Sequence, residues 1–424
     1  MDIVERVRVF FASLGPGLIT GAADDDPSGI STYSVAGASA GFSMLWLALI
    51  STPMMAVIQG MAARIAMVSG EGLAAIMRKR LPRWLAYGLA ILVIAANTFN
   101  VGADIGGMSD SAHMIVPLPA DAWVFLFGVG LVAAQIWLSY ATLARIFKWL
   151  TLALFAYPIT AIVVRPHWLA VLANLFIPHI QLNAGWLATM VGVLGTTITP
   201  YLFFWQSSLM VEEDRASGKR SVRSRRGTDR ASVDAMHIDV NTGMIYSNAV
   251  ALFIMVATAA TLGAHGEHNI ATAQQAAAAL RPLAGRGAEL LFTVGMVGTG
   301  ILAVPVLATS SAYVAAQTFS FREGLDEAPQ RAPHFYGVIA IGVGVGILMN
   351  LLKINAIQAL FWSAVFNGVA AVPLIVVIVW LASDRKLMGE WRSSPIARGW
   401  GWFTAAIMGA GTLAMFYFMG TNRS

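Results

Sequence analysis

Three consecutive carboxylates, Asp24, Asp25 and Asp26, interrupt an apolar stretch near the amino terminus and are followed directly by Pro27-Ser28-Gly29. Each ionised side chain at the centre of a membrane helix costs several kcal/mol, roughly 2.5–3.5 kcal/mol on insertion scales. The three acids must therefore face an aqueous cavity, a bound ion or one another. The neighbouring proline breaks the helix and frees backbone carbonyl groups beside them.

A second interruption, Gly195-Thr196-Thr197-Ile198-Thr199-Pro200, lies within a later apolar stretch. Unwound backbone and carboxylates supply hard oxygen ligands, which suit a cation such as Mg²⁺, Mn²⁺ or Ca²⁺ and not an anion. A simple proline kink with acids at its mouth is the structural alternative, but the second, matching interruption disfavours it. A sodium-coupled amino-acid transporter would also use two broken helices, although it would not need three clustered acids.

The composition indicates an integral membrane protein. Of the 424 residues, 57% are hydrophobic and only 12% are charged, and the mean hydropathy is +0.69. An ordinary soluble domain has about 25% charged residues. The composition therefore excludes soluble enzymes and nucleic-acid binders, despite a pI near 9.6. The chain contains no cysteine, which excludes disulfides and thiolate metal sites.

Stretches of about 20 apolar residues predict eleven membrane helices in a single all-α transmembrane domain. The expected spans are 12–38, 43–68, 84–108, 121–141, 146–165, 186–210, 239–262, 288–316, 335–352, 355–381 and 399–419. The two interruptions fall in the first and sixth spans, and an odd offset of five places corresponding helices in opposite orientation. This pattern predicts a LeuT-like inverted repeat of five plus five helices, with repeats at about 12–165 and 186–381 and an additional helix at about 399–419.

Basic residues indicate the orientation of the chain. With a cytoplasmic amino terminus, only Arg165, Arg281, Arg286, Lys353 and Arg423 lie outside, which leaves 22 of the 27 Lys and Arg residues inside. The positive-inside rule thus favours a multi-pass protein of the cytoplasmic (inner) membrane with an external carboxyl terminus.

Two loops carry charged or histidine side chains. The basic loop 211–238 is interpreted as a solvated cytoplasmic segment, with a lipid-headgroup or regulatory patch as the alternative. The external loop 263–286 contains His265, Glu267 and His268, but their spacing matches no defined metal-ligand motif.

Three motifs resemble those of the Nramp divalent-metal transporters. Residues 23–29 resemble the Asp-Pro-Gly-Asn motif of their first helix, and Gln59–Gly70 resembles the end of their second helix. Residues 195–202 are similar to their sixth-helix motif, with Thr199-Pro200-Tyr201-Leu202 where the family has Met-Pro-His-Asn. The resemblance covers essentially all eleven helices. It implies metal transport by alternating access, with the metal as substrate and with no cofactor.

The resemblance also implies a set of metal ligands. Asp26 matches the family's aspartate, Gly29 stands at the asparagine position and Thr199 at the methionine position, while the backbone-carbonyl positions fall on Ala23 and Thr196. Loss of the thioether removes the preference for soft metals, and loss of asparagine makes room for a larger, partly hydrated ion. Since Mg²⁺ usually keeps several waters, the pattern resembles the branch called Nramp-related magnesium transporters.

Polar residues on other helices could bind the ion through water. Asp104 matches an acidic third-helix position of the family, and Asn367 lies near its polar tenth-helix ligand. Asp104 has a structural alternative, because Gly102 and Gly106 form a small-residue face on which the acid could simply bond to a neighbouring helix.

Other polar side chains in the spans have a weaker assignment. Asn97 and Asn100 are interpreted as interhelical hydrogen-bond partners, while Asp24 and Asp25 are expected to shape the electrostatic field or to line the entrance.

The sequence argues against proton coupling. Tyr201 stands at the family's histidine position, and all seven histidines are expected in loops: His113, His167, His179, His237, His265, His268 and His334. Coupling is also unnecessary, because a divalent ion gains about 4.6 kcal/mol per 100 mV, twice ~2.3 kcal/mol per charge. This energy suffices for roughly thousandfold accumulation.

We therefore expect an importer of Mg²⁺ and Mn²⁺ that is driven by voltage. Its expected partners are the metal ion and the lipid bilayer, with no nucleic acid and no obligate protein partner. A proton-coupled Mn²⁺/Fe²⁺ importer is the alternative within the same class, and a Mg²⁺ channel is the alternative from another class. A polytopic membrane enzyme is disfavoured because the intramembrane polar cluster lacks His, Cys and Lys.

Overall fold

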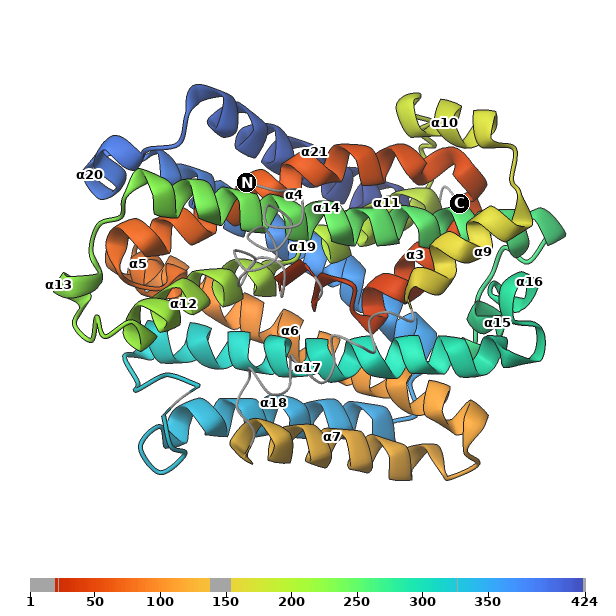
Figure 1. Ribbon diagram of the computed structural model, residues 1–424, viewed down its shortest axis with the longest axis horizontal. Helices are drawn as coiled ribbons and strands as arrows, with labels where there is room; N and C mark the ends of the chain where they lie inside the picture. The colour runs from red at the N-terminus through yellow and green to blue at the C-terminus, as the bar shows by residue number, and fades with distance from the viewer. Residues whose placement is uncertain (1–19, 22, 138–153, 326, 422–424) are drawn as a thin grey trace, which may run out of the picture.

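The computed structural model describes residues 20–21, 23–137, 154–325 and 327–421, and these residues contain helices and no strand (Figure 1). The longer helices are α3 (Pro27–Ala40), α4 (Leu45–Ser69), α6 (Arg83–Ile115), α7 (Ala120–Trp137), α9 (Ala156–Val164), α10 (Trp168–Phe176), α11 (Ala184–Thr197), α12 (Pro200–Ala216), α14 (Arg230–Thr261), α17 (Ala288–Phe319), α18 (Pro333–Leu351), α19 (Ala356–Ser383) and α21 (Pro395–Gly420). Shorter helices are α5 (Leu73–Arg80), α13 (Val222–Arg225), α15 (Ala273–Ala278), α16 (Arg281–Ala284) and α20 (Arg385–Met388).

Within the described ranges, nine stretches are long and apolar enough to cross a membrane. One of them, Pro27–Ser69, joins α3 to α4 and so contains parts of two expected spans. The expected fifth span falls partly on residues 138–153, outside the described residues, and α9 covers most of its second half. The number of eleven helices and the repeat limits therefore stay predictions.

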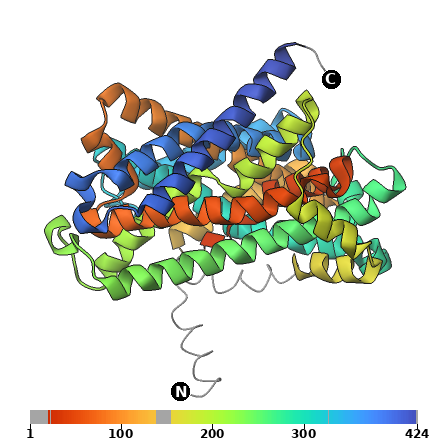
Figure 2. The same ribbon diagram turned by 90° about the horizontal axis from the view of Figure 1, so that it is seen from above.

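The two interrupted helices lie inside the bundle. α3 packs against α14, α11, α19 and α6, and α11 packs against α19. Figure 1 shows α17 crossing in front of α6, with α18 and α7 side by side along one edge. Figure 2 shows α14 beside α4 on another face of the bundle. Any site formed at the interruptions is thus surrounded by helices from both halves of the chain.

Glycines allow the closest approaches between these helices. A Cβ atom added at Gly195 of α11 would lie 2.2 Å from the carbonyl oxygen of Ala364 on α19. A Cβ atom added at Gly102 of α6 would lie 3.1 Å from the Cα of Gly346 on α18. Such backbone contact is how membrane helices pack where no water can drive association. The expected small-residue face of α6 is therefore used against α18.

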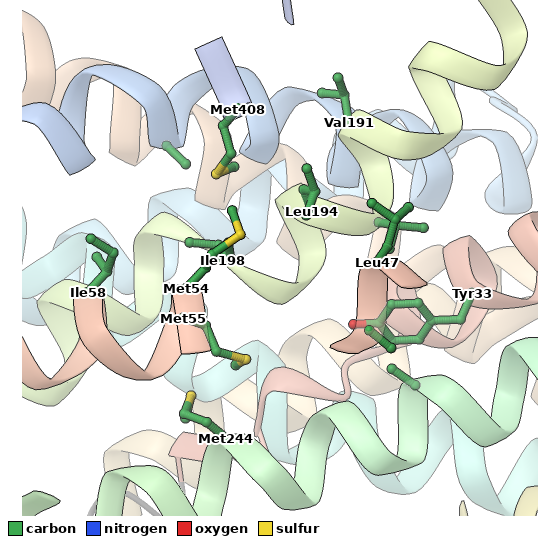
Figure 3. Close-up of a cluster of buried hydrophobic side chains, with 14 of the residues drawn as sticks. Tyr33, Leu47, Met54, Met55, Ile58, Val191, Leu194, Ile198, Met244 and Met408 are labelled. Carbon is green, nitrogen blue, oxygen red and sulfur yellow. The ribbon is translucent and has the colours of Figure 1, made fainter. Parts of the chain in front are cut away.

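A buried apolar cluster holds the second interruption in place. Ile198, fully buried at the end of α11, lies beside Leu194 and Met54, and Met55 faces Met244 of α14 (Figure 3). Large apolar side chains on the outside of the bundle are instead exposed, as at Leu126, Ile341 and Leu413, which fits a surface in contact with lipid tails. The polar site therefore lies within an apolar protein interior.

Basic segments gather at one end of the bundle. α5, α13 and α20 lie together there, while α15 and α16 lie at the opposite end (Figure 1). Arg80 contacts Asp384 with an Nη1 to Oδ2 distance of 3.1 Å, and the backbone N–H of Gly227 donates to Val68 across 3.1 Å. The contacts place these segments on a common side, as the charge pattern predicts.

Two expectations about the connections are wrong. The loop expected at 211–238 is shorter, because α12 continues to Ala216, α14 already begins at Arg230, and α13 lies between them. Four histidines expected in loops lie in helices: His113 in the last turn of α6, His237 in α14, His334 in the first turn of α18, and His265 at the end of the short 3-10 helix Gly263–His265. The reason is the same in both cases, since backbone hydrogen bonding continues past the end of the apolar stretch.

Candidate metal centre

The first interruption orients one oxygen of Asp26 toward the chain itself. A helical segment ends at Asp24, and Asp26 is extended with φ −72° and ψ 171°, immediately before Pro27 begins α3. Its Oδ1 accepts hydrogen bonds from the backbone N–H of Gly29 and the hydroxyl of Ser28, both across 2.7 Å. Asp26 is thus the N-cap of α3, which fixes the direction of its carboxylate.

The second interruption has the same local design. α11 ends at Thr197, Thr199 is extended with φ −91° and ψ 136°, and Pro200 begins α12. A residue before proline avoids the helical conformation, so both interruptions follow from the position of proline. Thr199 is buried, but its hydroxyl caps nothing.

Each proline also explains one free carbonyl. Proline has no N–H and cannot donate to the carbonyl four residues earlier. Counting back four residues from Pro27 and Pro200 gives Ala23 and Thr196, the two backbone ligands implied by the family resemblance. The same residues that break the helices therefore leave these oxygens without a helical partner.

The two interruptions touch one another. The hydroxyl of Tyr201, in the first turn of α12, donates to the carbonyl oxygen of Ala23 across 2.8 Å. The hydroxyls of Tyr33 and Thr197 lie 3.2 Å apart. Gly29 also lies close to the second interruption, since an added Cβ would be 3.2 Å from Oγ1 of Thr196. Residues from near positions 26 and 199 thus form one site.

The other oxygen of Asp26 leads into a chain of amides and acids. Asn100 on α6 donates its Nδ2 to Oδ2 of Asp26 across 3.0 Å and to Oδ2 of Asp104 across 3.3 Å. Asn367 on α19 donates to Oδ1 of Asn100 across 3.2 Å. The structure therefore brings Asp104 and Asn367 to the first interruption, with Asn100 between them.

Asp104 does not belong to the glycine packing face. Gly102 and Gly106 pack against α18, whereas Asp104 is fully buried and contacts Asn100 on its own helix. The contacts thus do not place Asp104 against α18, and its role as a ligand through water, or as a partner of another neighbouring helix, stays a prediction.

Several buried oxygens of the site have no hydrogen-bond partner within the described residues. They are Oγ1 of Thr196, Oγ1 of Thr199, Oδ1 of Asp104 and Oδ1 of Asn367, all on side chains at most 2% exposed. Buried polar groups are rarely left unpaired, so each one calls for an explanation. Oxygen atoms with free lone pairs are ligands for a hard cation or for its waters.

A cation here would rely on a mixed set of ligands. The described residues contain no group of three or more His, Cys, Asp or Glu side chains arranged to hold a metal ion. Carboxylate, hydroxyl, amide and carbonyl oxygens, together with water, would have to complete the coordination. Mg²⁺ is bound in this way more often than in a cage built only of protein ligands.

Asp24 and Asp25 face another helix. Ser247 on α14 lies 2.6 Å from Oδ2 of Asp24 and 3.3 Å from Oδ1 of Asp25. Both acids are fully buried, and each has a second oxygen without a partner in the described part of the chain. They lie beside the site on the α14 side, where their hydrogen-bond partner is Ser247 and not Asn100 or Asn367.

Three roles in the site are not predicted from the sequence. They are those of Asn100 as the link to Asp26, of Tyr201 as a hydrogen-bond donor, and of Ser247 as the partner of Asp24 and Asp25. One signal was present for Asn100, because it precedes Asp104 by four residues and so lies on the same helical face. No comparable signal existed for Tyr201 or Ser247, whose partners lie 178 and 223 residues away.

The fold and the site define a class of protein: a polytopic transporter with two discontinuous helices that meet inside a LeuT-like bundle. The chain belongs to the Nramp family, because the family model described as natural resistance-associated macrophage protein-like matches residues 17–418. It is therefore a transporter and not an enzyme.

Relatives and solved structures agree with this assignment. The chain is 28% identical over 409 residues to the divalent metal cation transporter MntH of Aeromonas hydrophila, with 93% of both chains covered. It is 27% identical over 389 residues to MntH of Acidiphilium cryptum, covering 88% of this chain and 83% of the relative. A manganese transporter of Eremococcus coleocola has the same fold, with a TM-score of 0.73, 19% identity, and 98% and 87% of the two chains covered. The fold also resembles that of MhsT, at a TM-score of 0.58, 14% identity, and 95% and 98% coverage.

Proposed function

We propose that this protein imports Mg²⁺, and also Mn²⁺, across the cytoplasmic membrane by alternating access and without proton coupling. The observation that carries the proposal is the set of unpartnered, hard oxygens at the interruptions, on Thr196, Thr199, Asp104 and Asn367, beside the carboxylate of Asp26. The MntH relatives, named as divalent metal cation transporters, support the general class of substrate.

Asp26 and Asp104 supply the carboxylate oxygens of the proposed site, and their neighbours supply neutral oxygens. Oδ1 of Asp26 is held by Gly29 and Ser28, so only Oδ2 is oriented toward Asn100 and the centre of the bundle. The hydroxyls of Thr196 and Thr199 could bind a metal-held water, while the carbonyls of Ala23 and Thr196 are the backbone ligands. Methionine at position 199 would instead favour a softer ion.

Gly29 adds space to the proposed site. Gly29 has no side chain, whereas a Cβ atom at this position would lie 3.2 Å from Oγ1 of Thr196. A site that admits a partly hydrated ion needs such room, because Mg²⁺ gives up its waters reluctantly.

A cavity of about 600 Å³ lies at the end of the bundle with the basic segments, between α4, α12 and α14. It is lined by four acids, Glu213, Asp214, Asp229 and Asp239, and by two basic residues among its other side chains. We propose that this end faces the cytoplasm and that the acidic lining receives the released cation, since a concave surface with one dominant charge concentrates counter-ions.

A proton-coupled Mn²⁺ importer is the second candidate. It is favoured by the extra buried acids, Asp24, Asp25 and Asp104, whose burial requires a counter-charge or a proton. One assay separates the two candidates: flux of Mg²⁺, Mn²⁺ and Ca²⁺ into proteoliposomes with the internal pH recorded. Uptake of Mg²⁺ without internal acidification supports the first, and metal-dependent acidification with no Mg²⁺ flux supports the second.

A further inference from the structure

Tyr201 connects the two interruptions through its hydroxyl, which lies next to two oxygens that are proposed to bind the cation. Its hydroxyl lies 2.8 Å from the carbonyl oxygen of Ala23 and 3.5 Å from Oδ2 of Asp26. Tyr201 belongs to α12, which follows the second interruption, whereas Ala23 and Asp26 flank the first. The contact therefore crosses from one half of the chain to the other.

We infer that the hydroxyl of Tyr201 competes with the transported cation for Ala23 and Asp26 and replaces it as the cross-link between the two broken helices when the carrier returns without cargo. The inference rests on the proposed transport of a divalent cation, and it assigns to Tyr201 one step of that cycle.

Competition follows from the geometry. Protein oxygens bind Mg²⁺ at about 2.0–2.1 Å and Ca²⁺ at about 2.3–2.6 Å, so a cation shared by Ala23 and Asp26 must lie between those two atoms. The tyrosine hydroxyl is within 3.5 Å of both oxygens and directs its hydrogen at the carbonyl. A hydrogen directed at a lone pair repels a cation that approaches the same lone pair. Binding must therefore turn the hydroxyl away from Ala23.

The position of Tyr201 is fixed, which lets it act as a defined cross-link. Its side chain is only 1% exposed, and Ser310 of α17 donates to its backbone carbonyl across 2.8 Å. A carrier that moves cargo in one direction must reorient empty, and without either the cargo or the tyrosine hydroxyl the carbonyl of Ala23 would lack this donor in the protein interior. The neutral hydroxyl of Tyr201 satisfies the carbonyl of Ala23 with its one hydrogen, and the cation must later displace this hydrogen bond.

The test is Tyr201→Phe, which removes only the hydroxyl. Purified protein in proteoliposomes is assayed with Mn²⁺ in two modes: net uptake into metal-free vesicles, and exchange of labelled Mn²⁺ against internal Mn²⁺. Net uptake requires return of the empty carrier, but exchange does not. We expect net uptake to fall about tenfold while exchange is retained, and the Mn²⁺ affinity in detergent to rise roughly two- to tenfold because one hydrogen bond no longer has to be displaced.

Tyr336→Phe is the matched control. The hydroxyl of Tyr336 also donates to backbone carbonyls, those of Leu325 and Glu327 at 3.3 and 3.0 Å, but it lies on α18 outside the site. This variant should keep the wild-type ratio of net uptake to exchange. If Tyr201→Phe is unstable, Ser310→Ala loosens the same tyrosine and should give the same separation to a smaller degree.

An equal fall in net uptake and exchange, or unchanged affinity and unchanged flux in both modes, would overturn the inference about Tyr201. Absence of Mn²⁺ and Mg²⁺ flux in the wild-type protein would instead overturn the proposed function. The two failures are therefore distinguishable.

Discussion

Asn100 donates its side-chain amide to Oδ2 of Asp26 across 3.0 Å, which joins α6 to the first interruption. The same amide lies 3.3 Å from Asp104, so one neutral group stands between two buried acids. An amide can donate to both acids at once because it carries two N–H groups. Asn100 thereby orients Oδ2 of Asp26, the oxygen that does not cap α3.

Replacement of Asn100 should impair transport more than it impairs folding. Asn100→Ala removes the donor that orients Asp26, and the loss of a group that orients a metal ligand typically costs about 10–100-fold in affinity or activity. Mg²⁺ uptake by proteoliposomes measures the effect. Asn97→Ala is the control, because Asn97 lies on the same helix and donates to Ser311 across 3.0 Å without touching an acid of the site.

Asp26 supplies the carboxylate at the first interruption of the proposed site, and Asp26→Asn should abolish uptake. The amide retains an oxygen that can cap α3 but lacks the negative charge, so the loss is expected to exceed about a hundredfold. Asp384→Asn is the matched control, since Asp384 is also an aspartate N-cap, whose Oδ1 accepts from the backbone N–H of Lys386 across 2.8 Å, and it lies outside the site and the acidic cavity. Normal uptake by a folded Asp26→Asn protein would show that the cation binds elsewhere.

Thr199 is expected to control metal selectivity. Thr199→Met introduces a soft thioether, and adding Gly29→Asn introduces an amide oxygen and fills the space beside Thr196. We expect Mg²⁺ transport to fall and the preference for Mn²⁺ or Cd²⁺ over Mg²⁺ to rise by roughly tenfold or more. Competition of each metal against labelled Mn²⁺ uptake measures the change.

The double substitution needs a folding control. A Cβ atom added at Gly29 would lie 3.2 Å from Oγ1 of Thr196, so the neighbour must shift by a few tenths of an ångström. Monodispersity in detergent identifies a variant that tolerates the shift. An unchanged metal preference in such a protein would contradict a site between the two interruptions.

The driving force should be the membrane potential. An inside-negative potential of 100 mV is expected to increase accumulation of a divalent ion up to roughly a thousandfold at equilibrium. The internal pH should stay constant during uptake, because neither interruption contains a histidine. A potassium gradient with valinomycin sets the potential, and an enclosed pH dye reports proton movement. Acidification in proportion to uptake would favour the proton-coupled alternative.

Glu323 should make stability depend on pH. It follows α17, and burial raises its pKa to about 7, although Arg215 opposes the shift. Because the folded-state pKa lies above the unfolded value of 4.5, this group destabilises the fold progressively as the pH rises from about 4.5 to 7. The contribution is at most about 3 kcal/mol.

Glu323→Gln removes the ionisation and should therefore raise the melting temperature at pH 8 relative to wild type, with little difference at pH 5. Thermal unfolding in detergent at the two pH values measures this. Glu327→Gln is the control, because Glu327 is partly exposed and its pKa is lowered by its hydrogen bond to Arg322. A uniform shift of the melting temperature at both pH values would contradict the assignment.

The sequence predicts the interruptions but not the contacts between them. Proline at positions 27 and 200 determines where the helices break, a local effect that needs no tertiary information. The small-residue face formed by Gly102 and Gly106 can also be predicted from the sequence, because residues four positions apart lie on the same face of a helix. Helix rotation and depth, however, decide whether Tyr201 reaches Ala23, and these depend on packing among segments far apart in the chain.

The histidine positions show a different limit. Hydropathy locates the apolar part of a helix and not its end, so it predicts loops at His113 and His237 although the helical hydrogen bonds include them. Neither error affects the site, because the helices extend at the ends of the bundle and the interruptions lie within it.

Pro27 and Pro200 lack the N–H that would donate to the carbonyls of Ala23 and Thr196, and this has a consequence for mutagenesis. Substitution of Ala23 and Thr196 cannot test the proposed backbone ligands, because both positions keep their carbonyl oxygens whatever residue stands there. The Ala23 carbonyl loses a donor when the hydroxyl of Tyr201 is removed, whereas a residue with an N–H at position 27 or 200 supplies a donor that proline lacks. Replacement of either proline would therefore test the proposed backbone ligands while every proposed side-chain ligand is retained.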